Sequence, residues 1–143
     1  MNKKNILITK NDREKLLQLI EDIEKHVQCD NEKKALLFNL KVKLKCTSIV
    51  SPQDIPPTYV TMNSKFQYLN IDSGKISTYS LVFPEEASID QNKISIISPV
   101  GIAVLGQSVG DLVECKLPFG VAYLKVLHII YQPEAMGIYT IWV

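Results

Sequence analysis

The stretch ISPVGIAVLGQSVGD, residues 97–111, constrains how the rest of the chain can fold. Ser98 is a favourable N-cap, Pro99 suits the first helical position, and Gly106 suits the residue after a helix. Four aliphatic residues and an alanine lie among the six positions after the proline. We therefore predict a helix of about two turns ending at Leu105, with that leucine and the valine before it in the core.

A β-hairpin is predicted on each side of this short helix. Residues 58–71 and 75–83 are rich in β-branched and aromatic residues, and Asp72-Ser73-Gly74 supplies the turn between them. Residues 111–131 form a second hairpin with Pro118-Phe119-Gly120 at its tip. An antiparallel sheet packed against a short helix is an α+β domain.

The end of the chain, IYTIWV at residues 138–143, alternates in a way that a strand would divide between two faces. We favour an added strand for this segment. A tail and a dimer contact remain the alternatives that the residues leave open.

Residues 11–46 predict a short antiparallel helical hairpin. Asn11 can cap the first helix, with Glu14 at the spacing of a capping box. One face of each helix is apolar, and the residues concerned are Leu16, Ile20, Ile23 and Val27 in the first helix and Leu37, Leu40 and Leu44 in the second.

The chain divides into three parts on this evidence. Residues 1–50 hold a strand-like segment and the helical hairpin, and residues 51–58 form a hinge whose prolines forbid helical continuation. Residues 59–143 form the α+β domain. A stiff hinge could point in several directions, so the angle between hairpin and domain stays open.

Composition excludes several classes of protein. The chain has 143 residues, of which 46% are hydrophobic and 22% charged, which is typical of a globular domain. A net charge of +1 disfavours strong unspecific nucleic-acid binding, and we expect no sequence-specific nucleic-acid partner. No apolar run approaches the length of a membrane span, and the N-terminus is too short in apolar residues for a signal peptide. We expect a cytoplasmic protein.

No pattern of catalytic or metal-ligating residues stands out. Cys29, Cys46 and Cys115 contain no CxxC pair, so we expect neither a disulfide framework nor a metal site. His128 lies inside an apolar strand, with no nucleophile beside it in the sequence, and is interpreted as structural. No phosphate-binding glycine loop is present. We predict a non-catalytic interaction protein without a cofactor, and we expect a monomer.

The two predicted helices carry opposite charge. The first has five acidic and three basic residues from Asp12 to Gln28, and the second has five lysines and one glutamate from Asn31 to Cys46. Mutual complementarity and solvated faces explain this difference. The alternative is an acidic or nucleic-acid partner that binds the lysine-rich helix, and Lys34 and Lys41 are the residues to test.

Four segments resemble the GreA/GreB family of transcript-cleavage factors, and within it the Rnk-like regulators of nucleoside diphosphate kinase. They are SPQDIPPTYVTMNSKFQYLN (51–70), SLVFPEE (80–86), ISIISPVGIAVLGQSVGD (94–111) and LKVLHIIYQPEAMG (124–137). The resemblance implies an FKBP-like C-terminal domain that docks on the rim of the secondary channel of RNA polymerase. It assigns docking to Ser98 and Pro99, and with them Val100 and Gly101. The family usually has a polar or acidic residue before this serine, where this chain has Ile97.

In Gre factors the helical arm enters the channel, and an acidic pair at its tip helps to hold a catalytic magnesium ion. Asp30 and Glu32 are the corresponding tip residues by this resemblance. Arms of about 18 and 16 residues reach only about 25 Å at 1.5 Å per residue, which is shorter than in Gre factors. We therefore expect a polymerase-binding regulator that competes with Gre factors without stimulating cleavage. The alternative implied by an FKBP-like fold is a peptide-binding or prolyl isomerase domain.

Overall fold

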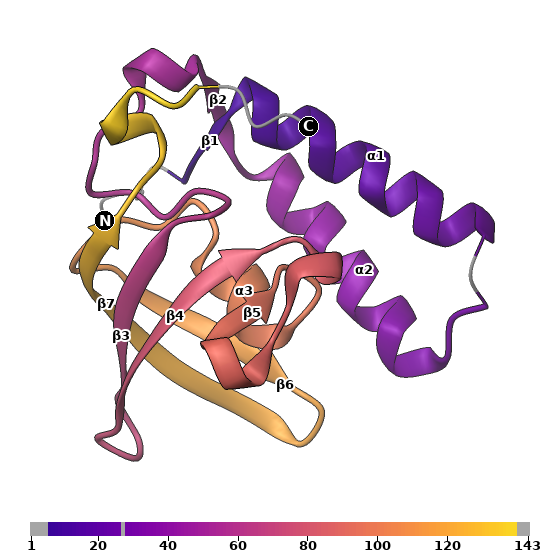
Figure 1. The fold of residues 1–143 in the computed structure, drawn as a ribbon. Coiled ribbons are helices and arrows are strands. Elements are labelled where there is room, and N and C mark those ends of the chain that lie inside the picture. Colours follow the sequence, from indigo (N-terminus) through magenta and orange to yellow (C-terminus); the bar gives the residue numbers. More distant parts are fainter. Residues whose placement is uncertain (1–5, 27, 140–143) are drawn as a thin grey trace.

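The computed structural model describes residues 6–26 and 28–139. Two long helices near the N-terminus are followed by a curled sheet that holds a third, short helix (Figure 1). The elements in chain order are β1 (Leu7–Thr9), α1 (Lys10–His26), α2 (Asn31–Lys45), β2 (Ser48–Val50), β3 (Lys65–Asn70), β4 (Ile76–Val82), β5 (Lys93–Ser95), α3 (Pro99–Val104), β6 (Leu112–Leu117) and β7 (Gly120–Tyr131). Four single 3-10 turns lie at Pro52–Asp54, Pro84–Glu86, Ile89–Gln91 and Glu134–Met136.

The five-stranded sheet has the order β5-β4-β3-β7-β6. Both predicted hairpins are present, since β3 pairs with β4 and β6 with β7 in antiparallel register. Gly74 lies in the first turn with φ of 74°, a left-handed conformation that glycine adopts without strain. The predicted antiparallel sheet is extended at one edge by β5, which runs parallel to β4 and makes the sheet mixed. Parallel pairing arises because the chain crosses back through two 3-10 turns between these strands.

The helical hairpin is formed as predicted, and its apolar faces are buried. Leu16, Ile20 and Ile23 of α1 and Leu37, Leu40 and Leu44 of α2 all belong to the core. Val27, the fourth predicted residue of the first stripe, lies outside the described residues.

The N-cap predicted for α1 was wrong. The helix begins at Lys10, and Thr9 Oγ1 accepts the hydrogen bond from the backbone N–H of Asp12 at 3.1 Å. Threonine is a favourable cap residue, although a weaker one than asparagine. Strand β1 runs directly into the helix and leaves Thr9, not Asn11, at the cap position. The Asn11 side chain instead donates to the carbonyl of Tyr139 at 2.6 Å.

A small parallel pairing of β1 with β2 closes the base of the arm. The backbone N–H of Leu7 also donates to the carbonyl of Gly106, just after α3, at 3.1 Å. Gly106 has φ of 79°, and a Cβ there would lie 2.9 Å from the Leu7 carbonyl oxygen. Glycine is therefore required both for the end of α3 and for the close approach of β1.

A single hydrophobic core joins the arm to the sheet. The buried leucines and isoleucines of α1 and α2 share one cluster with Phe66, Leu81, Ile96 and the residues of α3. The arm consequently lies along the side of the sheet and packs α2 against α3 (Figure 1).

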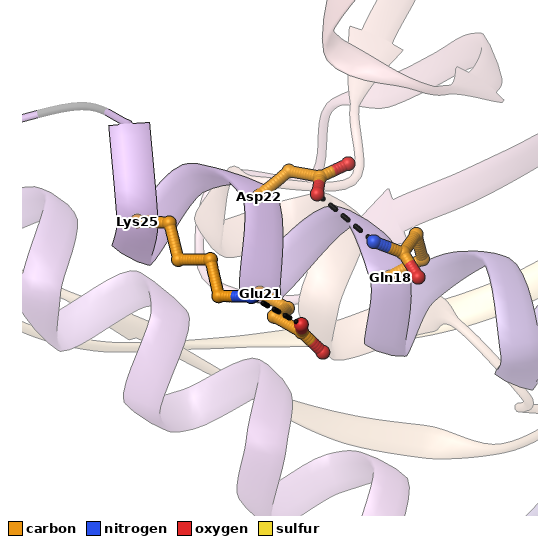
Figure 2. Close-up of polar contacts among 4 residues, drawn as sticks. All are labelled: Gln18, Glu21, Asp22 and Lys25. Atoms are coloured by element: carbon orange, nitrogen blue, oxygen red, sulfur yellow. Dashed lines mark hydrogen bonds and ion pairs between the residues drawn. The ribbon is translucent and has the colours of Figure 1, made fainter.

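The outer surface of α1 carries ordinary helix pairs. Gln18 donates to Asp22 at 2.9 Å and Lys25 pairs with Glu21 at 2.8 Å, both at i,i+4 spacing (Figure 2). Such exposed pairs each stabilise a helix by about 0.2–0.5 kcal/mol. Glu21, Asp22 and Lys25 are thus paired within the helix itself.

The strand predicted at residues 138–143 is not seen where the structure describes the chain. Ile138 and Tyr139 follow a 3-10 turn and have no strand assignment, and residues 140–143 lie outside the described residues. No helix in the described ranges combines the length and the apolar character that a membrane span requires.

Candidate docking surface

The first turn of α3 is fixed by the side chain of Ser98. Its Oγ accepts a hydrogen bond from the Gly101 N–H at 3.1 Å and donates to the Ser95 carbonyl at 2.6 Å. Pro99 follows at the first helical position. The predicted cap is therefore confirmed, and it ties the start of α3 to the end of β5.

The remainder of α3 is core. Gly101 is buried, and a Cβ there would lie 2.4 Å from the Ser95 carbonyl oxygen, so no larger residue fits without moving the backbone. Val104 and Leu105 are fully buried, as predicted. Of the four residues proposed for docking, Gly101 shapes the turn from inside, while Ser98, Pro99 and Val100 are half-buried.

Pro99 lies between two hollows in the surface. The larger, of about 870 Å³, is bounded by Val100, by Tyr68 and Tyr79 on the sheet, and by the loop that holds Ile89. The smaller, of about 300 Å³, lies between α2, α3 and β6. The first turn of α3 thus forms the ridge between two apolar depressions, a shape suited to contact with another surface.

Lys43 of α2 connects the arm to the residues that follow this turn. Its Nζ donates to the carbonyl of Ala103 at 2.7 Å. In the amide orientation that satisfies both neighbours, Gln107 accepts from the same Nζ at 2.9 Å and donates to Asp111 Oδ2 at 3.0 Å. Burial lowers the pKa of Lys43 to about 8, against the opposing effects of Cys46 and Asp111. The arm and the 97–111 stretch are therefore joined by one polar network.

The tip of the arm is occupied by structural contacts. Asp30 is the N-cap of α2, and its Oδ1 accepts the Lys33 N–H at 2.8 Å. Glu32 is exposed in the first turn of the same helix. Both line a hollow whose other wall is Pro84 and Glu85 of the sheet domain, so the tip lies beside that domain. Within residues 6–26 and 28–139, no group of three ligand-type side chains is placed to hold a metal ion.

The two lysines proposed for partner binding differ in their surroundings. Lys41 Nζ pairs with Glu24 Oε2 of α1 at 2.5 Å, which supports the complementarity of the two helices for this residue. Lys34 is exposed on the same helix. Exposed pairs contribute at most about 1 kcal/mol, so Lys41 remains available to a partner at small cost.

A buried pair of carboxyl groups was not predicted from the sequence. Asp12 Oδ2 accepts the Met62 N–H at 3.0 Å, and Glu134 Oε1 accepts the Thr61 hydroxyl at 2.8 Å. Burial, with the nearby charge of Glu134, raises the pKa of Asp12 to about 7. Burial also raises the pKa of Glu134. These groups join the start of α1 to the end of the sheet.

An exposed apolar face on α2 was also not predicted from the sequence. Phe38 is 65% exposed and Val42 is 41% exposed, although both belong to a helix whose opposite face is core. The sequence does indicate this second apolar face, because residues 35–44, ALLFNLKVKL, contain more apolar residues than one buried face of a helix accommodates.

Known proteins resemble this chain in sequence and in structure. They share the arrangement of a short capped helix against a curled sheet, with a helical arm packed beside it. The family described as transcription elongation factor GreA/GreB, C-terminal domain, matches residues 55–131. The chain therefore belongs to the GreA/GreB family.

Among individual relatives, the chain is 39% identical over 103 residues to the regulator of nucleoside diphosphate kinase of Escherichia coli K12, covering 71% of this chain and 76% of that protein. It is 37% identical over 93 residues to transcription elongation factor GreA of Acetivibrio thermocellus, covering 65% of this chain but only 58% of that protein. A solved GreA/GreB factor from Nitrosomonas europaea superposes with a TM-score of 0.67 at 32% identity, covering 90% of this chain and all of that one. The chain is thus a transcription-factor-like regulator related to the Gre factors.

Proposed function

We propose that this protein binds RNA polymerase at the rim of the secondary channel, through the Ser98–Pro99 end of α3, and competes there with Gre factors. Family membership supports the kind of partner. The observation that carries the proposal is the placement of half-buried Pro99 between two hollows, at the start of a helix whose residues from Gly101 to Val104 are buried. A rigid, pre-formed turn loses little conformational entropy on docking.

The arm explains why competition would not be accompanied by transcript cleavage. Helices of 17 and 15 residues extend only about 25 Å and about 22 Å at the rise of an α-helix. The arm is also packed along the sheet, and the Asp30 carboxylate already caps α2. We infer that neither Asp30 nor Glu32 delivers a metal ion to the polymerase active centre, so the protein acts without catalysis.

The name of the Escherichia coli relative extends this proposal to a physiological role. That protein is called a regulator of nucleoside diphosphate kinase. We propose that the present chain acts on the level of such a kinase through transcription, as a monomer bound to polymerase in the cytoplasm.

A second candidate function is favoured by the larger hollow beside α3. Tyr68 and Tyr79 stack with ring centroids 6.2 Å apart and face this hollow together with Val100. Aromatic and aliphatic walls suit the binding of a proline-containing peptide. An isomerisation assay on such a peptide tests this candidate, which is abandoned if the protein does not accelerate the reaction.

The docking proposal is tested by titrating labelled protein with core RNA polymerase. We expect saturable binding at micromolar concentration or tighter, and at least about tenfold weaker binding by Pro99→Asp, which places a charge on the ridge. Ile89→Asp is the matched control, because Ile89 is 90% exposed at the far wall of the larger hollow. Absence of binding, or equal loss in both variants, would remove the assignment of Pro99.

A further inference from the structure

Strand β6 ends the sheet and leaves one row of its backbone groups unpaired by any described strand. Among the described strands it neighbours only β7. Two backbone hydrogen bonds fix which groups of β7 face β6. The Val126 N–H donates to the Asp111 carbonyl on the β6 side, whereas the Tyr123 carbonyl accepts from the Ile71 N–H on the β3 side. Because backbone groups alternate along a strand, those of Val113 and Cys115 face β7. Those of Leu112, Glu114 and Lys116 therefore face away from the sheet.

The smaller hollow lies along this open edge. Glu114 and Lys116 line one side, and Phe38 and Val42 of α2 line the other. Pro99, Ile102 and Ala103 of α3 form part of the lining as well. A strand edge faced by a helix across an apolar hollow is the geometry that proteins use to bind an extended peptide.

The two faces of β6 define what such a peptide must contain. Val113 and Cys115 point inward and are buried, whereas Glu114 and Lys116 point outward and are exposed. A strand added beside β6 continues this alternation. Its inward side chains would lie over α3 and reach Phe38 and Val42, and its outward side chains would lie opposite Glu114 and Lys116.

We propose that the groove between β6 and α2 binds an extended segment of a partner protein by strand addition to β6. The segment has apolar residues at alternate positions and an acidic residue opposite Lys116. This site requires no polymerase, and it goes beyond the docking of Pro99, although Pro99 lies at one end of the groove.

The observations favour an extended segment over the other occupants. A docked helix would leave the backbone groups of Glu114 and Lys116 unpaired under an apolar cover, which costs free energy for each group. Single-stranded RNA would place phosphates beside Glu114 and over the aliphatic lining of α3. A strand satisfies both the hydrogen-bonding edge and the apolar wall.

The experiment uses the full chain and blocked seven-residue peptides of alternating isoleucine and charged residues. Two versions place glutamate opposite Lys116 in parallel or antiparallel pairing, and a scrambled peptide of the same composition is the control. We expect a dissociation constant of about 100 µM or below for one version. Its binding should protect the Glu114 and Lys116 amides from hydrogen exchange.

Glu114→Pro is the informative variant, because proline is tolerated in an edge strand where its missing N–H would face outward. We expect unchanged circular dichroism and at least about tenfold weaker peptide binding. Should this variant unfold, the same peptide N-methylated at its edge-facing amides, tested on the unaltered chain, must lose binding to the same degree. Val42→Glu should also weaken binding, while Ile89→Glu on another surface should not.

Three results would overturn the proposal. They are no binding of either alternating peptide at about 1 mM, equal binding of the scrambled peptide, or binding that depends on Val42 but survives both Glu114→Pro and N-methylation. The last result would assign the groove to a helix.

Discussion

Lys43 Nζ, on α2 of the arm, lies 2.7 Å from the carbonyl oxygen of Ala103 near the C-terminal end of α3. Lysine is favourable at this end of a helix, because the last carbonyls have no partner within the helix. The contact links the arm to the element proposed to dock on polymerase. The arm thus supports α3 from the side of α2.

Lys43→Met should weaken that support. The methionine retains the aliphatic stem but removes the donor to Ala103, and we expect a loss of about 1–3 kcal/mol in the free energy of unfolding. Urea denaturation measures this loss of stability. The control is Lys45→Met, at an exposed position of the same helix. An unchanged stability would show that the contact is replaced by water.

The contribution of Lys43 to the free energy of unfolding should depend on pH, which is a separate prediction. The pKa of Lys43 is about 8 in the folded chain and about 10.5 in the unfolded one. Between these values the unfolded chain binds more protons, so this residue makes stability rise with pH from about 8 to about 10.5. The stability advantage of wild type over Lys43→Met should therefore widen as pH rises through this window. A difference that stays constant would contradict the assignment.

Asp12→Asn should stabilise the protein at pH 8. Because the pKa of Asp12 is raised to about 7 in the fold, the unaltered chain loses stability as pH rises from about 4 through about 7. Asparagine keeps an oxygen for the Met62 N–H and removes the buried charge, for an expected gain of about 2 kcal/mol. Thermal unfolding at pH 4 and pH 8 checks it against exposed Asp22→Asn, and a gain at pH 4 equal to that at pH 8 would count against burial of the charge.

Gly101→Ala should disrupt the first turn of α3. The added carbon would lie 2.4 Å from the Ser95 carbonyl oxygen, so we expect a loss of about 2–3 kcal/mol. Pro99→Ala, two residues earlier in the same turn, is the control and should lower the free energy of unfolding by less than about 1 kcal/mol. Equal stability of the two variants, measured by urea denaturation, would mean that β5 and α3 separate easily.

Charge reversal distinguishes the two interpretations of the lysine-rich helix. If a partner reads this face, Lys34→Glu and Lys41→Glu each weaken polymerase binding by about threefold or more, and increasingly so at low salt. Lys25→Glu on α1 controls for net charge. Affinities that match this control would leave the lysines as solvated surface.

The fold could be predicted largely from local signals. The Ser98 cap, the Gly74 turn and the leucine stripe of α2 depend on neighbouring residues, and each is confirmed. The predicted cap of α1 was wrong because local preference favours Asn11 over Thr9, whereas β1 runs directly into the helix and leaves Thr9 at the cap position.

The site was less accessible to prediction, because its contacts join residues far apart in the chain. In the sequence, Lys43 cannot be distinguished from the other lysines of α2, because its partner Ala103 comes from α3. Asp12 and Glu134 are 122 positions apart in sequence, and their burial follows from how the arm folds back on the sheet. The open edge of β6 likewise depends on the strand order, which hairpin signals do not specify.

The central claim, that this protein occupies the polymerase site of Gre factors without cleaving, is tested most directly on backtracked transcription complexes. Transcript cleavage driven by a fixed concentration of GreA is measured while the protein is titrated in. We predict that cleavage falls progressively to the level seen without GreA, and that Pro99→Asp needs at least about tenfold more protein for the same effect. Cleavage stimulated by the protein itself, or GreA activity unchanged at a hundredfold excess or so, would contradict the account.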